Sequence, residues 1–492
     1  MLLKRYAVRL SAASVSPLCE FSLRFVRTII LSRLLMPNDL GAAVALVTIL
    51  SSSELITDVG LEKFVMVNAG ETRAQAVAAA QQITITRAVL LAMAIALFAP
   101  VLADIFGASA HVGSIAWLGA VPLIRSFRNL RTVQIQQDYR YGPEAISNVV
   151  GQIGAVIVVV PAAAWFRDER AMLASLIVEA ALYVMLSHLL VPQERVAAID
   201  PIMRRAALSF GLPLMANGIG LMVLSQLDRV IVANLFDLAT LALYSLALNL
   251  AIVPISPLLI VVNKIGMPFL GRLHADPTAS NQGSLIVVLG VLLCAAAYAT
   301  VVGLSLDKLV PLLYGIQYKV TPAFCALATI VAFLRICRGA PNLILLTHSR
   351  TGRLTAGNMI AGVGPFIGLL LASSTRRVEA ALLGLLIGDL ASLITLFSLA
   401  RRHLLMGTAF AHAGLLALPV GLAALGPLIV GGDGLGPRAL MLAVGGFVIG
   451  LDTLVVYRRV VAGFVNKGRS VSSRQGPDGI AVANADTLER RR

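Results

Sequence analysis

The residues of this chain that could do chemistry are ionisable side chains placed inside long apolar stretches. In the first stretch, Glu20, Arg24 and Arg27 are spaced by four and three residues, which puts them on one face of a helix. In the second, Glu54 and Asp58 are four residues apart and also share a face. Ionisable groups inside a membrane are costly and mostly face a cavity or a partner. The two stripes therefore indicate an aqueous cavity.

More candidates follow along the chain. They are Arg125 and Arg128, then Asn217, Asp228 and Arg229, and at the end of a later run Arg335 and Arg338. A guanidinium stays charged when it is desolvated, and its planar fork matches the oxygens of a phosphate. The number of arginines inside the runs therefore predicts a cationic cavity and an anionic substrate, above all a phosphate.

A purely structural role for these charges is the alternative. In that case the carboxylates neutralise the arginines as packing ion pairs, with Glu20, Glu54 and Asp58 facing Arg24, Arg27 and Arg125. Against it, a single structural bridge does not require polar stripes on several helices of one half of the chain. Both hypotheses stay open at the level of sequence.

The elements that position these residues must be membrane helices. The chain has 492 residues, of which 58% are hydrophobic and 13% charged, and its mean hydropathy is +0.87. Soluble domains carry about 25% charged residues. This composition excludes a cytosolic enzyme, a disulfide-stapled secreted protein and a disordered regulator, and it predicts an all-α polytopic membrane protein.

The sequence contains no motif typical of a metal site, a nucleotide site or a nucleic-acid-binding protein. The sequence contains no HExxH, GxSxG or P-loop pattern, and its four cysteines lie in apolar runs without CxxC spacing. The net charge of +15 comes from short clusters between the apolar runs, which is typical of loops that set topology. We expect no catalytic residues, no metal site, no cofactor and no nucleic-acid partner.

A bilayer core of about 30 Å takes roughly 20 apolar residues per helix. On this measure the chain holds about fourteen transmembrane helices, at 12–35, 41–65, 84–105, 113–134, 146–165, 171–192, 208–235, 240–264, 285–307, 320–340, 355–374, 378–400, 409–430 and 436–457. Lys and Arg concentrate in every second loop, which predicts cytoplasmic N- and C-termini. The pairs Gly364/Gly368, Gly384/Gly388 and Gly446/Gly450 have the small-xxx-small spacing of closely packed membrane helices.

The chain also repeats a pattern of arginine, β-branched run, short polar turn and leucine. It occurs at Arg27–Leu40 and again at Arg229–Leu241. Six helices separate the copies, so the repeats are parallel, and transporters bind substrate between such halves and rock them to alternate access. We predict an N-lobe at 1–200 with six helices, a C-lobe at 201–405 with six, two further helices at 406–460, and a disordered cytoplasmic tail at 461–492.

Several segments together resemble one family of transporters. They are Phe25–Gly41, Asp58–Leu61, Ser209–Met215, Ser225–Val232, Leu243–Leu246 and Leu313–Tyr318. The chain is thereby similar to the polysaccharide-transporter family of the multidrug/oligosaccharidyl-lipid/polysaccharide exporter superfamily. The resemblance runs across about the first 400 residues.

The resemblance implies a flippase rather than an enzyme. Members of that family flip undecaprenyl-pyrophosphate-linked oligosaccharides across the bacterial inner membrane for exopolysaccharide, capsule or O-antigen assembly. The expected substrate-binding residues are Arg24, Arg27, Arg125, Arg128, Arg229 and Asn217. Those expected to orient the arginines or to bind a coupling cation, Na⁺ or H⁺, are Glu20, Glu54, Asp58 and Asp228. The expected partners are the lipid-linked oligosaccharide, membrane lipids, and a polysaccharide polymerase and co-polymerase.

Three other functions remain as alternatives to an oligosaccharide flippase. A peptidoglycan lipid-precursor flippase also suits fourteen helices and a cationic cavity. A multidrug extruder of the same superfamily would prefer cationic drugs and an acidic cavity, which the arginines argue against. A membrane polysaccharide polymerase or ligase would need a large external loop, and the predicted external loops are short.

Overall fold

The computed structural model describes residues 2–68, 73–138, 140–192, 200–252, 254–273 and 277–400, and in these ranges every regular element is helical. The predicted all-α membrane fold is confirmed. The predicted helices at 409–430 and 436–457, the pair Gly446/Gly450 and the tail at 461–492 lie outside the described residues, so the total of fourteen stays a prediction.

The first half of the chain supplies the helices α1 (Leu2–Leu34), α2 (Pro37–Ile56), α3 (Leu61–Val67), α4 (Arg73–Leu97), α5 (Ala99–Ile105), α6 (Val112–Leu118), α7 (Ala120–Ser126), α8 (Arg131–Gln134), α9 (Gly142–Phe166) and α10 (Arg170–Leu190), with short 3₁₀ turns at Ser109–His111 and Ile135–Asp138. The second half supplies α11 (Pro201–Ser225), α12 (Leu227–Leu235), α13 (Leu238–Ile252), α14 (Ile255–Leu273), α15 (Pro277–Tyr314), α16 (Pro322–Cys337), α17 (Gly339–Thr347), α18 (Thr351–Ile360), α19 (Val363–Thr375) and α20 (Glu379–Ala400).

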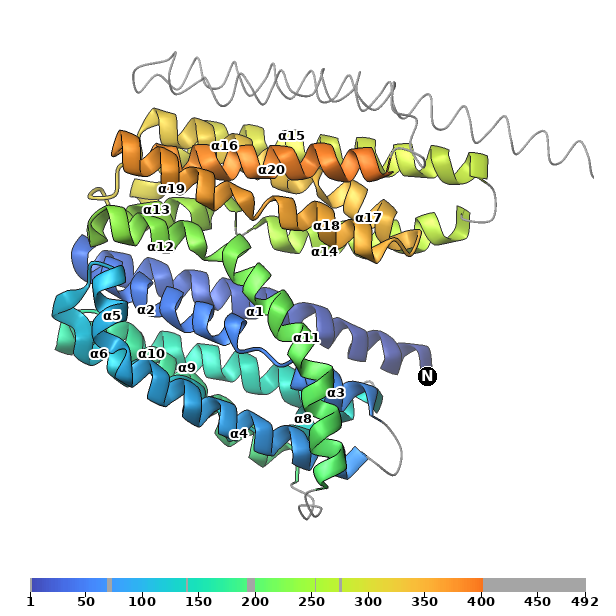
Figure 1. Ribbon diagram of the computed structural model, residues 1–492, viewed down its shortest axis with the longest axis horizontal. Coiled ribbons are helices and arrows are strands. Elements are labelled where there is room, and N and C mark those ends of the chain that lie inside the picture. The colour runs from blue at the N-terminus through green and yellow to red at the C-terminus, as the bar shows by residue number, and fades with distance from the viewer. Residues whose placement is uncertain are drawn as a thin grey trace, which may run out of the picture.

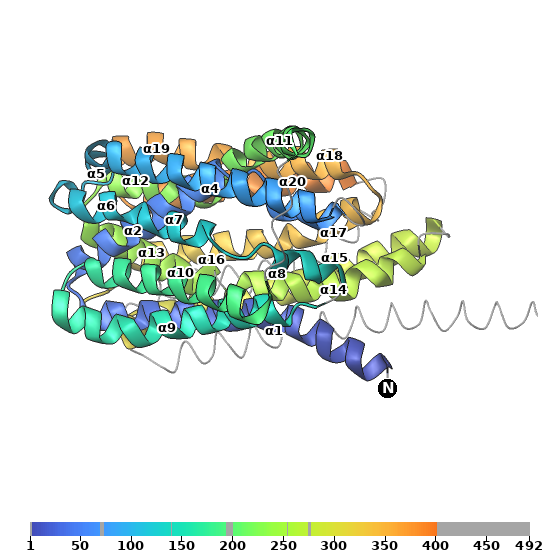
Figure 2. The same cartoon turned by 90° about the horizontal axis from the view of Figure 1, so that it is seen from below.

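The helices form two layers with their long axes running in broadly one direction. Figure 1 shows the first half, in blue and cyan, as one layer and α12–α20 as the other. The helix α11 runs obliquely across the first layer, where it contacts α2, α3 and α4, and then joins α12. Seen from below, α1 and α9 lie along one edge and α11 and α19 along the opposite edge (Figure 2). The domain boundaries at 200 and 405 stay predictions.

Within the described residues, nine helices or helix pairs are long and apolar enough to cross a membrane. Three of the twelve runs predicted there do not meet that measure. The run 12–35 belongs to α1, which is long but carries several charges. The run 113–134 is divided into α6, α7 and α8, and the run 240–264 is divided into α13 and α14.

Several predicted continuous runs are broken, including 41–65, which is divided into α2 and α3, and two of the breaks have a clear local reason. The run 240–264 breaks at Pro254, because proline has no N–H to donate within a helix. The run 208–235 breaks at Gln226, whose φ of −129° and ψ of −22° are not helical. The prediction of one helix over 208–235 was therefore wrong in its continuity, and the break places the Arg229 region on a short helix of its own.

The two layers meet along α2 and α13. A Cβ atom on Gly41 in α2 would lie 1.9 Å from the carbonyl oxygen of Leu238 at the start of α13, so this crossing requires glycine. Each of these helices directly follows the repeated arginine motif in its own half. The helices α2 and α13 therefore hold equivalent positions in the two halves, and they pack against each other where the halves meet.

The predicted close packing of glycine pairs is confirmed in the second layer. A Cβ atom on Gly384 in α20 would lie 2.2 Å from the backbone nitrogen of Gly368 in α19. Gly364 and Gly388 face each other in the same contact. Because these glycines carry no side chain, the two backbones approach closely and their van der Waals contact stabilises the pair.

Candidate functional site

A cavity of about 240 Å³ lies where the two layers meet, and we call it the central cavity. Its lining comes from α1, α2 and α10 of the first half and from α12 and α13 of the second. The side chains that carry a formal charge are Arg24, Arg27 and Arg229, and most of the remaining wall is apolar. The structure thus brings together the repeated arginines Arg27 and Arg229, which the sequence places in different halves.

The two arginines of α1 share one carboxylate. Arg27, which is 5% exposed, donates from Nη1 to Oε2 of Glu179 at 2.9 Å. Arg24 has its Nη2 4.0 Å from Oε1 of the same residue, and its side chain is 52% exposed. Oε1 of Glu179 also accepts a hydrogen bond from Gln152 at 2.7 Å. One carboxylate on α10 therefore faces both arginines of the α1 stripe.

This arrangement corrects the packing ion pairs weighed from sequence. Glu20 does not neutralise the arginines beside it, since it accepts a hydrogen bond from Ser16 one turn earlier at 2.8 Å. The partner of Arg27 is Glu179, which sequence analysis missed because it stands alone in an apolar run. The structure pairs them because α1 packs on α9, which in turn packs on α10, and these segments are far apart in the chain.

The third arginine of the central cavity has neutral partners. Arg229 donates to Oε1 of Gln226 at 3.0 Å and to Oδ1 of Asn249 at 2.9 Å. It makes no ion pair within 4 Å in the described part of the chain. Its neighbour Asp228 is buried outside the cavity lining and accepts a hydrogen bond from Tyr244 at 3.0 Å. The side chain of Arg229 is therefore fixed in position while its charge is not cancelled by a carboxylate.

A second cavity of about 470 Å³ lies inside the first layer, and we call it the ionic cavity. It is bounded by α2, α3, α4 and the segment from α7 to α8. Its charged lining residues are Glu54, Asp58, Glu62, Lys63, Arg87, Arg125 and Arg128. Cations and carboxylates are thus interleaved around one space, with one cation in excess.

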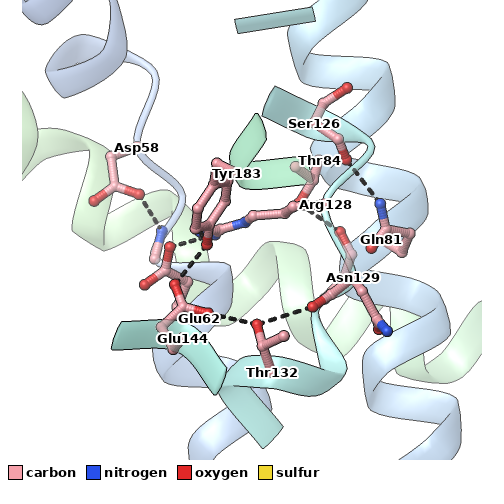
Figure 3. A network of polar contacts seen from close by, with 12 residues as sticks. Asp58, Glu62, Gln81, Thr84, Ser126, Arg128, Asn129, Thr132, Glu144 and Tyr183 are labelled. Carbon is pink, nitrogen blue, oxygen red and sulfur yellow. Dashed lines mark hydrogen bonds and ion pairs between the residues drawn. The ribbon is translucent and has the colours of Figure 1, made fainter. Parts of the chain in front are cut away.

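One wall of the ionic cavity is a continuous polar network (Figure 3). Arg128 donates to Glu62 and to the hydroxyl of Tyr183, and Tyr183 donates to Glu144. Glu144 also accepts a hydrogen bond from Thr132. Glu62 stands on α3, beyond the span of α2, and the Arg128 guanidinium holds its pKa below the ordinary value. The carboxylate is ionised at neutral pH, so Arg128 is firmly held.

Arg125 and Arg87 are less completely paired. Arg125 stands over the ring of Tyr183, 5.5 Å from its centroid, and lies within electrostatic range of Glu54 and Glu179. Arg87 donates from Nη1 to the backbone oxygen of Thr57 at 2.9 Å. Sequence analysis missed Arg87 because it stands near the edge of the apolar run 84–105. The helix itself begins at Arg73, so Arg87 lies well inside it.

The second layer contains a counterpart of the arginine pair. Arg335 donates to Asp389 at 3.0 Å, and Arg338 donates to the other oxygen of the same carboxylate. At one constant offset along the chain, the residues Arg125, Arg128 and Glu179 recur as Arg335, Arg338 and Asp389. The two halves use this repeated set differently. In the second layer the acid holds both arginines, whereas in the first the acid is taken by Arg27 of α1.

The predicted site residues thus fall into three places. Those in the central cavity are Arg24, Arg27 and Arg229, and those in the ionic cavity are Glu54, Asp58, Arg125 and Arg128. Those that line neither cavity are Glu20, Asp228 and Asn217, of which Asn217 is exposed on α11. Their roles in binding or coupling stay predictions. Among the described residues no group of three or more His, Cys, Asp or Glu side chains is arranged to hold a metal ion.

Comparisons with known proteins agree on one class. Residues 30–323 match the model of a family described as polysaccharide biosynthesis protein. A segment of 149 residues is 26% identical to the amylovoran biosynthesis protein AmsL of Erwinia amylovora, covering 30% of this chain and 38% of that protein. The chain therefore matches well under half the length of that relative.

Two solved structures share the fold. The lipid II flippase MurJ in an inward closed conformation has a TM-score of 0.67 at 9% identity, covering 91% of this chain and 99% of that one. An inward-facing multidrug resistance transporter of the MATE family, within the MOP superfamily, has a TM-score of 0.54 at 14% identity, covering 83% and 98%. At these identities the likeness concerns the fold alone.

Proposed function

Because this chain belongs to the polysaccharide biosynthesis protein family and has the fold of MOP-superfamily transporters, we propose that it flips undecaprenyl-pyrophosphate-linked oligosaccharide repeat units across the bacterial inner membrane. Alternating access between the two layers would carry the repeat unit toward exopolysaccharide, capsule or O-antigen assembly. The membership places the chain in polysaccharide biosynthesis, its apolar helices support a multi-pass membrane protein, and the transport role is part of the proposal. The substrate, the membrane and the mechanism are the proposal.

The observation that carries the proposal is the set of arginines in the central cavity. Arg24, Arg27 and Arg229 face one space, and Glu179 is the carboxylate paired with two of them. An arginine that stays charged inside a membrane protein requires a partner or water. A pyrophosphate offers several oxygens that guanidinium forks can bind. The small volume and apolar walls suit a compact anion more than a whole glycan.

The origin of the three arginines supports alternating access. Two of them stand on α1 of the first half and one on α12 of the second. An anion bound by all three would draw the halves together at this point, and its departure would leave like charges facing each other. Substrate binding would thereby favour one arrangement of the halves over the other, which is the differential affinity that a population shift requires.

Substitution of Arg229 tests the proposal. In cells that lack their own copy of the gene, the Arg229→Gln variant should export at least tenfold less polymer than the wild type. Membrane-inserted protein and Tm should change little, because the partners of Arg229 are neutral and no charge is left unpaired. Arg229→Lys should also export poorly, since an ammonium lacks the bidentate fork.

The matched control is Arg170→Gln. The Arg170 side chain is 63% exposed and lies outside both cavities, so export should stay normal. Wild-type export by Arg229→Gln at equal protein levels would remove the arginine set from the mechanism. Rescue of cells depleted of their peptidoglycan-precursor flippase, without an effect on polymer, would point to lipid II as the substrate instead.

The proposal also covers the ion gradient that drives flipping and the proteins that receive the flipped repeat unit. We propose that a cation gradient, of Na⁺ or H⁺, drives the cycle through the carboxylates Glu54 and Asp58, which face the ionic cavity. We further propose that the polymerase and co-polymerase of the pathway receive the flipped repeat unit. Collapse of either gradient in inverted vesicles, with flipping measured by access of a lectin to the glycan, identifies the ion.

A further inference from the structure

Polar contacts join the two halves of the chain at one end of the molecule. At this end α1 leads into α2 and α12 leads into α13, and Gly41 of α2 meets Leu238 of α13. In Figure 2, α5 and α12 lie on one side of α2 and α13, and α1 lies on the other. On both sides of the crossing, side chains of one half donate hydrogen bonds to backbone carbonyls of the other.

Arg33, in the last turn of α1, makes the first of these contacts. Its guanidinium donates from Nε to the carbonyl oxygen of Leu313 at 2.8 Å and from Nη2 to that of Leu312. Because α15 ends at Tyr314, both carbonyls lie in its last turn, where the helix itself offers them no N–H. A positive charge is also favourable at the negative end of a helix dipole. Arg33 therefore caps a helix of the other half.

Two further side chains do the same in the opposite direction. Gln317, just after α15, donates from Nε2 to the carbonyl oxygen of Ser32 at 3.2 Å, in the last turn of α1. Asn234, near the end of α12, donates from Nδ2 to the carbonyl oxygen of Ile105 at 3.1 Å, at the end of α5. The capping between α1 and α15 is thus reciprocal, and a similar contact joins α12 to α5.

These contacts give a role to two of the segments that resemble the transporter family. Arg33 stands in the segment Phe25–Gly41, and Gln317 stands in the segment Leu313–Tyr318. Arg33 and Leu313 are 280 residues apart in the chain, and the structure places the two segments against each other. Neither Arg33 nor Gln317 lines the central cavity or the ionic cavity.

The caps are suited to a contact that breaks and forms again. The hydrogen bonds of Arg33 and Asn234 are exposed, so water can replace the carbonyl oxygens when the layers separate. By contrast, the ion pair between Arg27 and Glu179 lies within the first half and need not break. At the opposite end of the molecule, α8 packs on helices of the first layer, and α14 and α17 pack on helices of the second.

We propose that Arg33, Asn234 and Gln317 form a latch, which holds the two halves together at this end and opens when substrate is released there. On the predicted topology the N-terminus is cytoplasmic, so the end of α1 faces away from the cytoplasm. The inference rests on the proposed function and names the contacts that alternating access breaks. Loss of the caps removes contacts made only in the closed arrangement, so it shifts the population toward the open one.

Distances between spin labels on the purified full-length protein in nanodiscs test the latch. One label is attached at Trp165→Cys, near the end of α9, and the other at Ser374→Cys, near the end of α19. Both positions are exposed. Cys19 and Cys294, which are not fully buried, are replaced by serine. In double electron–electron resonance, the double variant Arg33→Ala with Gln317→Ala should raise the fraction with the longer separation at least fivefold.

Single variants separate the parts of the latch. Arg33→Lys keeps the charge but lacks the planar fork, so it should give a smaller shift than Arg33→Ala. Asn234→Ala should also lengthen the separation, because it removes the cap on the other side of the crossing.

The matched control is Arg170→Gln, because Arg170 pairs with Asp168 of its own half. It should leave the distances unchanged. Wild-type distances in both the double variant and Asn234→Ala would overturn the proposal. If the double variant does not insert, Arg33→Lys and Asn234→Ala provide the same test.

This measurement uses no substrate, so it separates failure of the latch from failure of the proposed function. If Arg229→Gln stops polymer export but the latch variants keep wild-type distances, the flippase function stands and the latch is wrong. If the latch variants lengthen the separation but neither they nor Arg229→Gln alter polymer export, the latch stands and the proposed function is wrong.

Discussion

At the scale of single residues, the arginines that line the two cavities differ in whether each one pairs with a carboxylate. Arg27 takes Glu179, and Arg128 takes Glu62. Arg229 and Arg87 have hydrogen bonds to neutral groups instead. An ion pair between two helices supports their packing, whereas an arginine without a carboxylate still lacks a counter-charge. This distinction separates the structural hypothesis from the binding hypothesis residue by residue.

The pair Arg27–Glu179 gives the sharpest test of that distinction. Glu179→Gln leaves a buried guanidinium unpaired, which costs about 3–5 kcal/mol, so the Tm in detergent and the amount of inserted protein should fall. The double variant Arg27→Gln with Glu179→Gln should recover most of the stability, because no buried charge remains unpaired and the Arg24 side chain, which also faces Glu179, is 52% exposed. It should still fail to export polymer if Arg27 contacts the pyrophosphate. Normal export by the double variant would assign Arg27 to packing alone.

At the scale of elements, glycine contacts decide how closely the helices approach. Gly41 permits the crossing of α2 with α13, and the glycines of α19 and α20 permit the closest helix pair in the second layer. Breaks in the helices also shape the cavities. The non-helical residue Gln226 separates α12 from α11, and on α12 Arg229 reaches Asn249 of α13. The cavities therefore depend on a few positions where the chain lacks a side chain or leaves helical geometry.

Gly384→Ala should destabilise the second layer. The added methyl group would meet the backbone of Gly368 at 2.2 Å, and overpacking of this kind costs about 1–3 kcal/mol. The matched control is Gly290→Ala on α15, where a Cβ meets nothing within 4 Å. There the better helix propensity of alanine should leave stability unchanged or raise it by up to about 1 kcal/mol. Thermal unfolding in detergent compares the two, and equal Tm values would contradict the close contact.

At the scale of the whole molecule, the two layers meet at the central cavity and use the charges of their repeated sequence pattern unequally. Arg335 and Arg338 share Asp389 and line a cavity of about 280 Å³ in the second layer, while Arg125 and Arg128 line the larger ionic cavity without Glu179. The two layers therefore differ in how their equivalent arginines are neutralised. The second layer contributes Arg229 to the central cavity and remains otherwise internally paired around Asp389.

The orientation of the molecule in the membrane is also testable. A phosphatase that is active only outside the cytoplasm should be active when it is fused after Arg170 and inactive when it is fused after Asp200. The reason is that the loops rich in Lys and Arg stay on the cytoplasmic side. Protein levels of each fusion, measured by immunoblot, provide the control. The reverse pattern would invert the predicted topology.

The sequence by itself determined the membrane class, the helical architecture, the repeated arginine motif and the polar stripe of α1. These follow from composition and from a helical period of 3.6 residues, both of which are local properties. Tertiary structure decided the partner of Arg27, the contact of Arg87 with Thr57 and the gathering of Arg24, Arg27 and Arg229. Ion pairs between helices depend on which faces pack together, and that contact joins residues as distant as Arg27 and Glu179. No spacing within one segment encodes it, because the packing of the entire bundle selects the pair.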